Sequence, residues 1–308
     1  TVMQDHKVIV FGSLNMDLSI ECPRVPLIGE TMLGSNFFTN PGGKGANQAV
    51  AAAKLGATVH MLGAVGDDAF GDQMIASLAE AGVNCERIAR VVGCPTGVAM
   101  IERIAGDNCI VVDSGANMRP TAQFVREGLE EVAQPGDIFL TQLECDFEET
   151  MASLRMAHDA GLTTVINPAP ARELPLDIYP YLDMVVVNET ECEELTGIYP
   201  SDDASCRLAM EKFLARGVRC SVITLGERGS ALLTAGPDEM LRSVPPQVTA
   251  IDTTCAGDTY IGALVAARAN GTAAQDAMRL ATRASALATT RVGAQQSIPT
   301  LAEANSLE

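Results

Sequence analysis

The sequence predicts an α/β protein with a mostly parallel central sheet and a small second sheet of antiparallel strands. Two observations predict this class. Short apolar runs rich in β-branched residues alternate with longer helical stretches, which is the pattern of strand-helix-strand units with parallel strands. Two other regions, at about 15–40 and 96–112, combine alternating residues with turn signals, as antiparallel strands do.

Each main-sheet strand is expected to be a short apolar run covered on both faces. These runs lie at residues 8–11, 59–62, 138–143, 163–166, 184–187 and 221–225. Four of the intervening helices are expected to end at a glycine, because glycine can adopt the left-handed conformation that closes a helix. They are 46–55 before Gly56, 74–81 before Gly82, 150–160 before Gly161 and 204–216 before Gly217.

The length of 308 residues suits one large α/β domain without a second fold. Ligands of open α/β sheets bind outside the carboxyl ends of the strands, so a small sheet emerging from those ends would cover the site. We therefore expect a single catalytic domain over residues 1–308, with lid strands inserted at about 15–40 and 96–112.

Composition excludes several classes of partner. The formal net charge of −18 argues against broad electrostatic binding to nucleic acid or to an anionic membrane. Nine cysteines occur without a zinc-binding or paired spacing, which predicts reduced thiols. Neither a secretion signal nor an apolar run long enough for a membrane span is visible, so we expect a cytoplasmic enzyme.

The sharpest motif, Asp-Thr-Thr-Cys-Ala-Gly-Asp-Thr at 252–259, precedes a helical stretch at 260–269. Backbone N–H groups at a helix start are unpaired and carry partial positive charge, so the small residues at 256–258 predict an anion hole for phosphate. Asp258 is a candidate base for a sugar hydroxyl that attacks phosphorus. The simpler alternative is a first-turn residue favoured by the helix dipole.

A second glycine-rich turn, Asn-Pro-Gly-Gly-Lys-Gly-Ala-Asn-Gln at 40–48, also leads into a helix. It lacks the Ser or Thr that follows the lysine of a phosphate-binding P-loop. Its exposed backbone, Lys44 and Asn47, together with Asn15 and Asp17 after the first strand, suit hydrogen bonding to several hydroxyls of one small sugar. The alternative is that Lys44 is a solvated charge and Asn47 a surface residue.

Two further groups follow buried strands. Asn188 and Glu191 could organise a metal-phosphate complex through water, although capping of a helix by Asn188 explains the pattern equally simply. Thr224, Gly226 and Gly229 form a turn that would allow a nucleotide to lie against the backbone, although an ordinary tight turn has the same composition.

Together the stretches 42–47 and 252–259 resemble the signatures of the ribokinase-like (PfkB) carbohydrate kinases, and the resemblance spans residues 7–300. It implies a three-layer α/β/α sandwich with a small antiparallel β lid. The segments 115–117, 167–171 and 291–295 are most similar to the branch of the family that phosphorylates ribose. The implied reaction transfers the γ-phosphoryl of ATP to the O5 hydroxyl of D-ribose.

The resemblance assigns expected roles to individual positions. Sugar binding falls to Asn15, Asp17, Gly42, Gly43, Lys44, Asn47 and Glu144. Asp258 is the implied base, with Cys255, Ala256 and Gly257 in the anion hole. ATP, which brings Mg²⁺, is implied to lie against Asn188, Glu191, Thr224, Gly226, Gly229, Gly257 and Thr282. A potassium ion is implied near Asp252, Thr254, Ala288, Arg291, Gly293 and Ser297.

Two positions depart from the family pattern. Cys255 stands where glycine or alanine is common, which predicts sensitivity to thiol oxidation if the side chain is exposed. Thr282 stands where a larger polar residue near adenine is expected, which bears on nucleotide preference.

Other functions are not excluded by the sequence. Alternatives are the same chemistry on 2-deoxyribose, on a hexose such as fructose or on a nucleoside, or a non-catalytic sugar sensor. A nicotinamide-dependent dehydrogenase is disfavoured because the dinucleotide fingerprint is missing. An open lid sheet would expose strand edges and an apolar face, so we expect a homodimer formed through the lid.

Overall fold

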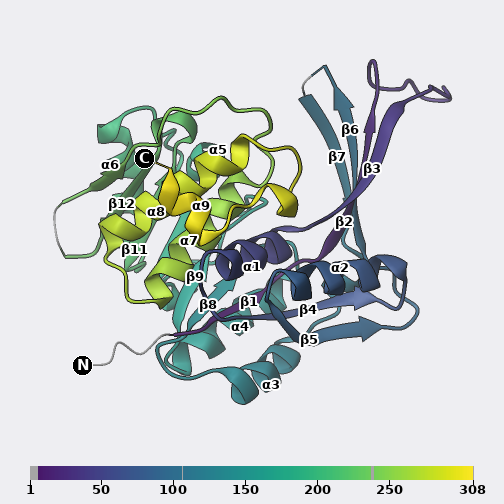
Figure 1. Cartoon of the computed structure of the whole chain (residues 1–308). Helices are drawn as coiled ribbons and strands as arrows, with labels where there is room; N and C mark the ends of the chain where they lie inside the picture. Colours follow the sequence, from purple (N-terminus) through teal and green to yellow (C-terminus); the bar gives the residue numbers. More distant parts are fainter. Residues whose placement is uncertain (1–5, 106, 237–238, 308) are drawn as a thin grey trace.

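The architecture is a long mixed sheet between two layers of helices, with a smaller sheet projecting from it (Figure 1). The computed structural model describes residues 6–105, 107–236 and 239–307. Within these residues the large sheet has nine strands in the order β13-β12-β11-β10-β9-β8-β1-β4-β5. Their bounds are β1 Val8–Phe11, β4 Val59–Gly66, β5 Asn84–Val91, β8 Ile138–Thr141, β9 Thr163–Ile166, β10 Met184–Val187, β11 Cys220–Thr224, β12 Ser230–Thr234 and β13 Leu241–Ser243.

The strands from β5 to β11 pair in parallel, and β12 and β13 add an antiparallel edge. All six predicted main-sheet strands are therefore confirmed. The sequence did not predict β5, β12 and β13. These strands lie at the two ends of the sheet, where partial exposure mixes polar residues into the strand, as in β5, or where the strand is only three residues long, as in β13.

Strand β1 has β8 on one side and β4 on the other, so the chain builds the sheet outward from β1 in both directions. Alternate residues of β1 point into different cores: Val8 and Val10 belong to one hydrophobic cluster, whereas Ile9 and Phe11 belong to the other. A topological switch point of this kind opens a crevice at the carboxyl ends of the strands.

Helices cover both faces of the large sheet. On the face with Val8 lie α1 Lys44–Lys54, α2 Ala69–Glu80, α7 Ala256–Ala269, α8 Ala274–Thr289 and α9 Leu301–Ser306. On the other face lie α3 Ala122–Val132, α4 Phe147–Asp159, α5 Glu189–Thr196 and α6 Asp203–Ala215. The three-layer arrangement is confirmed, and Gly56, Gly82, Gly161 and Gly217 all have the predicted positive φ. No helix in the described ranges is long and apolar enough to cross a membrane.

The small sheet has the order β3-β2-β6-β7, from β2 Asn15–Glu21, β3 Ser35–Gly42, β6 Gly97–Ile104 and β7 Asp107–Asp113. It rises as an arm beside the main body (Figure 1). The outer pairs are antiparallel, as predicted, but the central pair β2–β6 is parallel. The physical reason is that β2 and β6 both continue from carboxyl ends of the parallel main sheet, β2 after β1 and β6 after β5, and so run in the same direction.

Candidate active site

Polar side chains gather at the carboxyl edge of the main sheet. Asn15 follows β1 and Glu144 follows β8, so they lie on the two sides of the topological switch point. Asn167 follows β9, Asn188 follows β10, and Thr224 ends β11. Because parallel strands end at the same edge, residues that are up to about two hundred positions apart in the sequence share one crevice.

The turn after β1 is in direct contact with the start of α1. A Cβ atom built on Gly45 would lie 2.5 Å from the carbonyl carbon of Gly12 and 2.5 Å from the nitrogen of Ser13. Gly43 precedes α1 with φ at 90°, a conformation that favours glycine. These two glycines allow the chain leading to Asn15 to lie against the helix start.

Glu144 joins the β1 turn to the start of α1. Its carboxylate accepts hydrogen bonds from the Ser13 hydroxyl and, at 3.1 Å, from the backbone N–H of Lys44. The Ser13 hydroxyl in turn accepts from the Gly45 N–H at 3.2 Å. A partly buried carboxylate is thus fixed in place with acceptor capacity remaining.

The predicted sugar-binding residues of the small sheet lie at its base. Asn15 is 3% exposed, and its side-chain oxygen accepts a hydrogen bond of 2.7 Å from the amide of Asn117. Asp17 lies two residues further along β2, and a Cβ on Gly42 would come within 2.4 Å of its carboxylate. Gly42 is therefore the residue that leaves room for Asp17.

Asp258 lies in the first turn of α7 and is held by two amides of α1. The Asn47 Nδ2 donates to its Oδ2 at 3.0 Å, and the Gln48 Nε2 donates to its Oδ1 at 2.9 Å. The structure brings Asn47 and Asp258 together, as the prediction requires. Asn47 is buried, so the alternative of a surface helix residue is wrong.

The chain turns sharply into α7 at Cys255, which has φ 65° and ψ 4°. The Ala256 N–H donates to the Thr253 carbonyl at 3.2 Å. The N–H groups of Gly257 and Asp258 belong to the first turn of the helix, whose donors have no intrahelical acceptor. Unpaired donors at a helix start, together with the helix dipole, favour an anion at such a position.

Two adjoining cavities share Thr224 and Gly257 in their walls. The smaller, of about 200 Å³, is lined by Lys44, Asn188, Glu191, Cys255 and Asp258 among others. The larger, of about 610 Å³, is lined by Gly226, Gly229 and Thr282 together with apolar residues such as Pro245 and Val248. The predicted nucleotide-binding residues therefore divide into a polar part near Asp258 and a roomier part beyond it.

Asn188 and Glu191 form a reciprocal capping box at the start of α5. The alternative of helix capping by Asn188 is therefore what the structure shows, and the same two side chains also line the smaller cavity. Glu191 additionally accepts a hydrogen bond of 3.3 Å from the Asn167 amide. Burial raises the pKa of Glu191.

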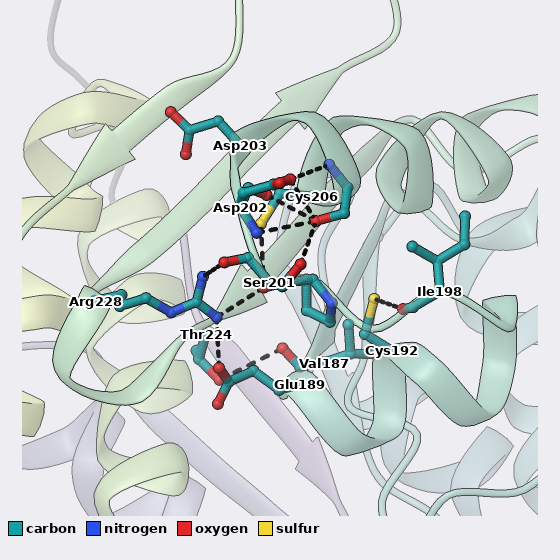
Figure 2. Close-up of polar contacts among 12 residues, drawn as sticks. Val187, Glu189, Cys192, Ile198, Ser201, Asp202, Asp203, Cys206, Thr224 and Arg228 are labelled. Atoms are coloured by element: carbon teal, nitrogen blue, oxygen red, sulfur yellow. Dashed lines mark hydrogen bonds and ion pairs between the residues drawn. The ribbon is translucent and has the colours of Figure 1, made fainter.

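The turn at residues 226–229 lines the larger cavity, and the side chain of Arg228 ties this turn to neighbouring segments (Figure 2). Its guanidinium donates to the carbonyls of Pro200 and Ser201, both at 2.7 Å, and to the carboxylate of Glu189 at 2.6 Å. Glu189 is the first residue of α5, next to Asn188. One arginine therefore links the two segments that line the cavities.

Charges in the site are strongly coupled. Burial, with the nearby negative charges of Glu144 and Asp258, raises the pKa of Asp17 to about 7. Burial alone would lower the pKa of Lys44, but Asp258, Glu144 and Glu191 outweigh this and raise it. The lysine is thus a firmly charged ammonium among carboxylates, and the alternative of a solvated charge is wrong.

The expected sensitivity of Cys255 to oxidation depended on exposure of its side chain. Cys255 is half-buried and lines the smaller cavity, so this sensitivity stays a prediction. Burial and the charge of Asp258 raise the pKa of its thiol well above the usual value, which disfavours the reactive thiolate. All nine cysteines are free, as predicted.

The predicted potassium positions surround one loop after α8. Asp252 accepts hydrogen bonds from the N–H of Thr254 at 2.9 Å and from the N–H of Gly293 at 3.0 Å. Arg291 donates to the carbonyl of Ala288 at 3.1 Å, and its side chain pairs with Glu303 at 2.7 Å. Ser297 is buried two residues after the 3₁₀ turn begins. Carboxylate and carbonyl oxygens of this kind suit a hard cation.

Sequence reasoning missed the supporting side chains. The structure adds four buried polar residues that contact predicted ones, Ser13, Gln48, Asn117 and Asn167. A fifth, Gln142, contacts Gln48. The available signal was the presence of uncharged polar residues inside otherwise apolar segments, since buried polar groups need partners.

The comparisons with known proteins agree with this geometry. The model of the pfkB family carbohydrate kinases matches residues 5–301. Haemophilus influenzae ribokinase is 38% identical over 295 residues, covering 96% of this chain and 95% of that protein. Schizosaccharomyces pombe ribokinase is 39% identical over 306 residues, covering 96% of each. The structure of Arabidopsis thaliana ribokinase complexed with ribose and ATP superposes with a TM-score of 0.90 at 29% identity, covering 99% of both chains.

The raised pKa of Asp17 predicts that the free energy of unfolding depends on pH. Between about pH 4 and 7 the folded protein keeps a proton that the unfolded chain has released, so stability falls as the pH rises through this window. Asp17→Asn removes the cost and should stabilise the fold at pH 8 by up to roughly 4 kcal/mol, with little change at pH 4. Thermal melts across this pH range measure the difference.

Asp107→Asn is the matched control, because Asp107 is an exposed carboxylate of the same small sheet. Its melting temperature should follow that of the unchanged protein at every pH. A stability difference for Asp17→Asn that does not vary with pH would contradict the raised pKa.

Proposed function

The chain belongs to the pfkB family of carbohydrate kinases, and from this premise we propose that it transfers the γ-phosphoryl of ATP to the O5 hydroxyl of D-ribose, as a ribokinase. The observation that carries the proposal is the position of Asp258. Its carboxylate lies in the first turn of α7, beside open backbone N–H groups that can hold an anion. A base and an anion hole in one helical turn are the two parts that phosphoryl transfer to a hydroxyl requires.

The sugar would bind at the start of α1. The amide, carboxylate and ammonium groups of Asn15, Asp17, Lys44, Asn47 and Glu144 would bind it together with the backbone of Gly42 and Gly43. Such a dense polar set suits a compact sugar with several hydroxyls better than a nucleoside with an apolar base.

ATP would occupy the two adjoining cavities. The triphosphate belongs in the smaller one, near Lys44, Gly257 and the Asn188–Glu191 pair, and the adenosine in the larger one, near Gly226, Gly229 and Thr282. The Glu191 carboxylate and the Asn188 amide fit the water shell of an Mg²⁺ ion that arrives with the nucleotide. When bound, the ion neutralises charge on the phosphates.

The proposed step forms a bond between the sugar O5 and the γ-phosphorus while the bond from that phosphorus to the bridging oxygen of ADP breaks. Asp258 accepts the O5 proton, and its carboxylate later releases that proton to solvent. Lys44 and the N–H groups of Gly257 and Asp258 stabilise the charge on the transferred group. The products are ribose 5-phosphate and ADP.

We also propose a potassium ion near Asp252, Thr254, Ala288, Arg291, Gly293 and Ser297. What supports it is the set of oxygen donors in this loop and its direct connection to the anion hole. Asp252 accepts hydrogen bonds both from Thr254, next to Cys255, and from Gly293. A cation there would stabilise the turn that precedes α7.

We further propose that residues 1–308 act as one catalytic domain in the cytoplasm, with the small sheet as a lid that also forms a homodimer. The dimer is supported by exposed apolar side chains on β6 and on the edge strand β7. Met100 of β6 is paired with Val111 of β7, and these side chains are 59% and 71% exposed, while Ile110 of β7 is 55% exposed. Exposed apolar strands of this kind are hazards that pairing with a second copy removes.

The role of Asp258 predicts a specific kinetic defect. Asp258→Asn should keep sugar and ATP binding, measured by calorimetry, but should lower kcat at least about a hundredfold, as for a lost general base. Asp276→Asn is the matched control, because Asp276 is also an acidic residue in the first turn of a helix, α8. Near-normal turnover of Asp258→Asn would show that Asp258 serves only the helix dipole.

A panel of acceptors tests the substrate. With ATP, kcat/KM for D-ribose should exceed that for 2-deoxyribose, fructose and a nucleoside by at least about tenfold, because a site built to bond hydroxyls rejects analogues that lack them. Potassium should raise turnover relative to the same concentration of sodium. Preference for another acceptor would replace ribose but retain the kinase, whereas inactivity on every acceptor would favour a sugar sensor.

Oligomeric state is tested by light scattering at micromolar concentration. The unchanged protein should have the mass of a dimer, and Val111→Glu should be a monomer because it places a charge on the exposed face of β7. Leu208→Glu, on the exposed surface of α6, serves as the control and should remain dimeric. A monomeric unchanged protein would refute the dimer without affecting the chemistry.

A further inference from the structure

Gln48 is a fully buried residue of α1 with no role in the proposed reaction so far. Its Nε2 donates to the Oδ1 of Asp258 at 2.9 Å and to the side-chain oxygen of Asn167 at 3.2 Å. Its Oε1 accepts a hydrogen bond of 2.6 Å from the Nε2 of Gln142. Every polar atom of this buried amide is therefore engaged.

The direction of the Gln48 amide is fixed by its neighbours. Gln142 donates to the oxygen end, so the two N–H groups must point towards Asp258 and Asn167. Gln142 is 1% exposed, and its own side-chain oxygen has no partner among the described residues. An unsatisfied buried acceptor destabilises the folded state, because the group has lost its hydrogen bonds to water. Stability alone therefore does not explain why Gln142 is buried with its side-chain oxygen unpaired.

The two oxygens of Asp258 have different surroundings. Oδ2 is held by Asn47, a predicted sugar-binding residue, whereas Oδ1 is held by Gln48 in the protein interior. Through Asn167 the same amide also connects to Glu191, because the Asn167 Nδ2 donates to the Glu191 carboxylate at 3.3 Å. Gln48 thus lies between the base and the side of the site where the nucleotide phosphates would bind.

We propose that Gln48 is a positioning residue for phosphoryl transfer: its oriented amide holds Oδ1 of Asp258 so that Oδ2 faces the sugar hydroxyl. The proposal rests on the proposed function of Asp258 as the base. In general, hydrogen-bond donors to a carboxylate favour its ionised form. The other ionisable groups near Asp258 are Lys44, which favours the charge, and Asp17, Glu191 and Cys255, which would oppose it when charged.

Substituting Gln48 tests the proposal in the full-length protein. Gln48→Met keeps the approximate volume but removes both donors, and Gln48→Glu places a second carboxylate against Asp258. We expect kcat to fall at least about tenfold in both, with KM for ribose and for ATP changed less than about threefold. The acid limb of the kcat profile should move to higher pH by at least about one unit, most in Gln48→Glu, because like charges oppose ionisation.

Gln275→Met and Gln275→Glu are matched controls. Gln275 is also a helical glutamine whose amide donates to an oxygen, the carbonyl of Arg242, at 2.9 Å. Neither control should change kcat or its pH profile. Gln142→Met is a milder second variant, because it leaves Gln48 in place but frees its amide to rotate; kcat should fall by an intermediate factor. A pH profile of Gln48→Glu that matches the unchanged protein would overturn the proposal.

A measurement that needs no turnover separates this proposal from the proposed function. The titration of Asp258 can be followed by carbon NMR of protein labelled at the aspartate carboxyl groups, with Asp258→Asn identifying the signal. The midpoint should rise by at least one pH unit in Gln48→Met and remain unchanged in Gln275→Met. An unshifted midpoint would refute the role of Gln48 even if the unchanged protein is an active kinase. Inactivity of the unchanged protein on all acceptors, with a shifted midpoint, would refute the kinase function but retain the effect of Gln48 on the Asp258 carboxylate.

Discussion

The site depends on the contact between α1 and α7, which joins the two glycine-rich segments of the sequence. Gly262 makes the contact close: a Cβ there would lie 2.4 Å from the Cβ of Ala51 and 2.8 Å from the carbonyl oxygen of Gln48. At this spacing the amides of Asn47 and Gln48 reach the carboxylate of Asp258. Since packed interiors do not deform freely, the distance between the helices determines where the Asp258 carboxylate points.

A protein of net charge −18 should repel an anionic nucleotide, and the local charges of the crevice explain how such a nucleotide could still bind. Phosphate would be held by local groups rather than by the overall field. Lys44 supplies a full charge that the surrounding carboxylates keep in place, and the first turn of α7 supplies backbone dipoles. Burial, with the charges of Glu144 and Asp258, raises the pKa of Asp17, and this lowers the stability of the folded state above about pH 4.

Further contacts hold the residues of the crevice in place. Asn117 holds Asn15, Asn167 joins Gln48 to Glu191, and Arg228 ties the loop beside the larger cavity to the start of α5. These contacts involve neutral amides, or a guanidinium bound to carbonyls and to a carboxylate, and they connect elements that are distant in the sequence. Side chains that bind small polar ligands need this second set of contacts to keep their orientation.

The sequence by itself determined the class of fold, the parallel strands of the sheet interior, the helix ends and the two motifs, because periodicity, glycine and local spacing are properties of neighbouring residues. Only the tertiary structure decided the parallel pairing of β2 with β6, the edge strands, and the neighbouring carboxylates that keep Lys44 charged. The same holds for the burial that raises the pKa of the Cys255 thiol. Gln48 belongs to the second glycine-rich motif, but nothing in the sequence indicated its contact with Asp258, which is 210 positions away. The physical reason is that pairing direction, burial and the field at a charged group are set by residues brought together only when the chain folds.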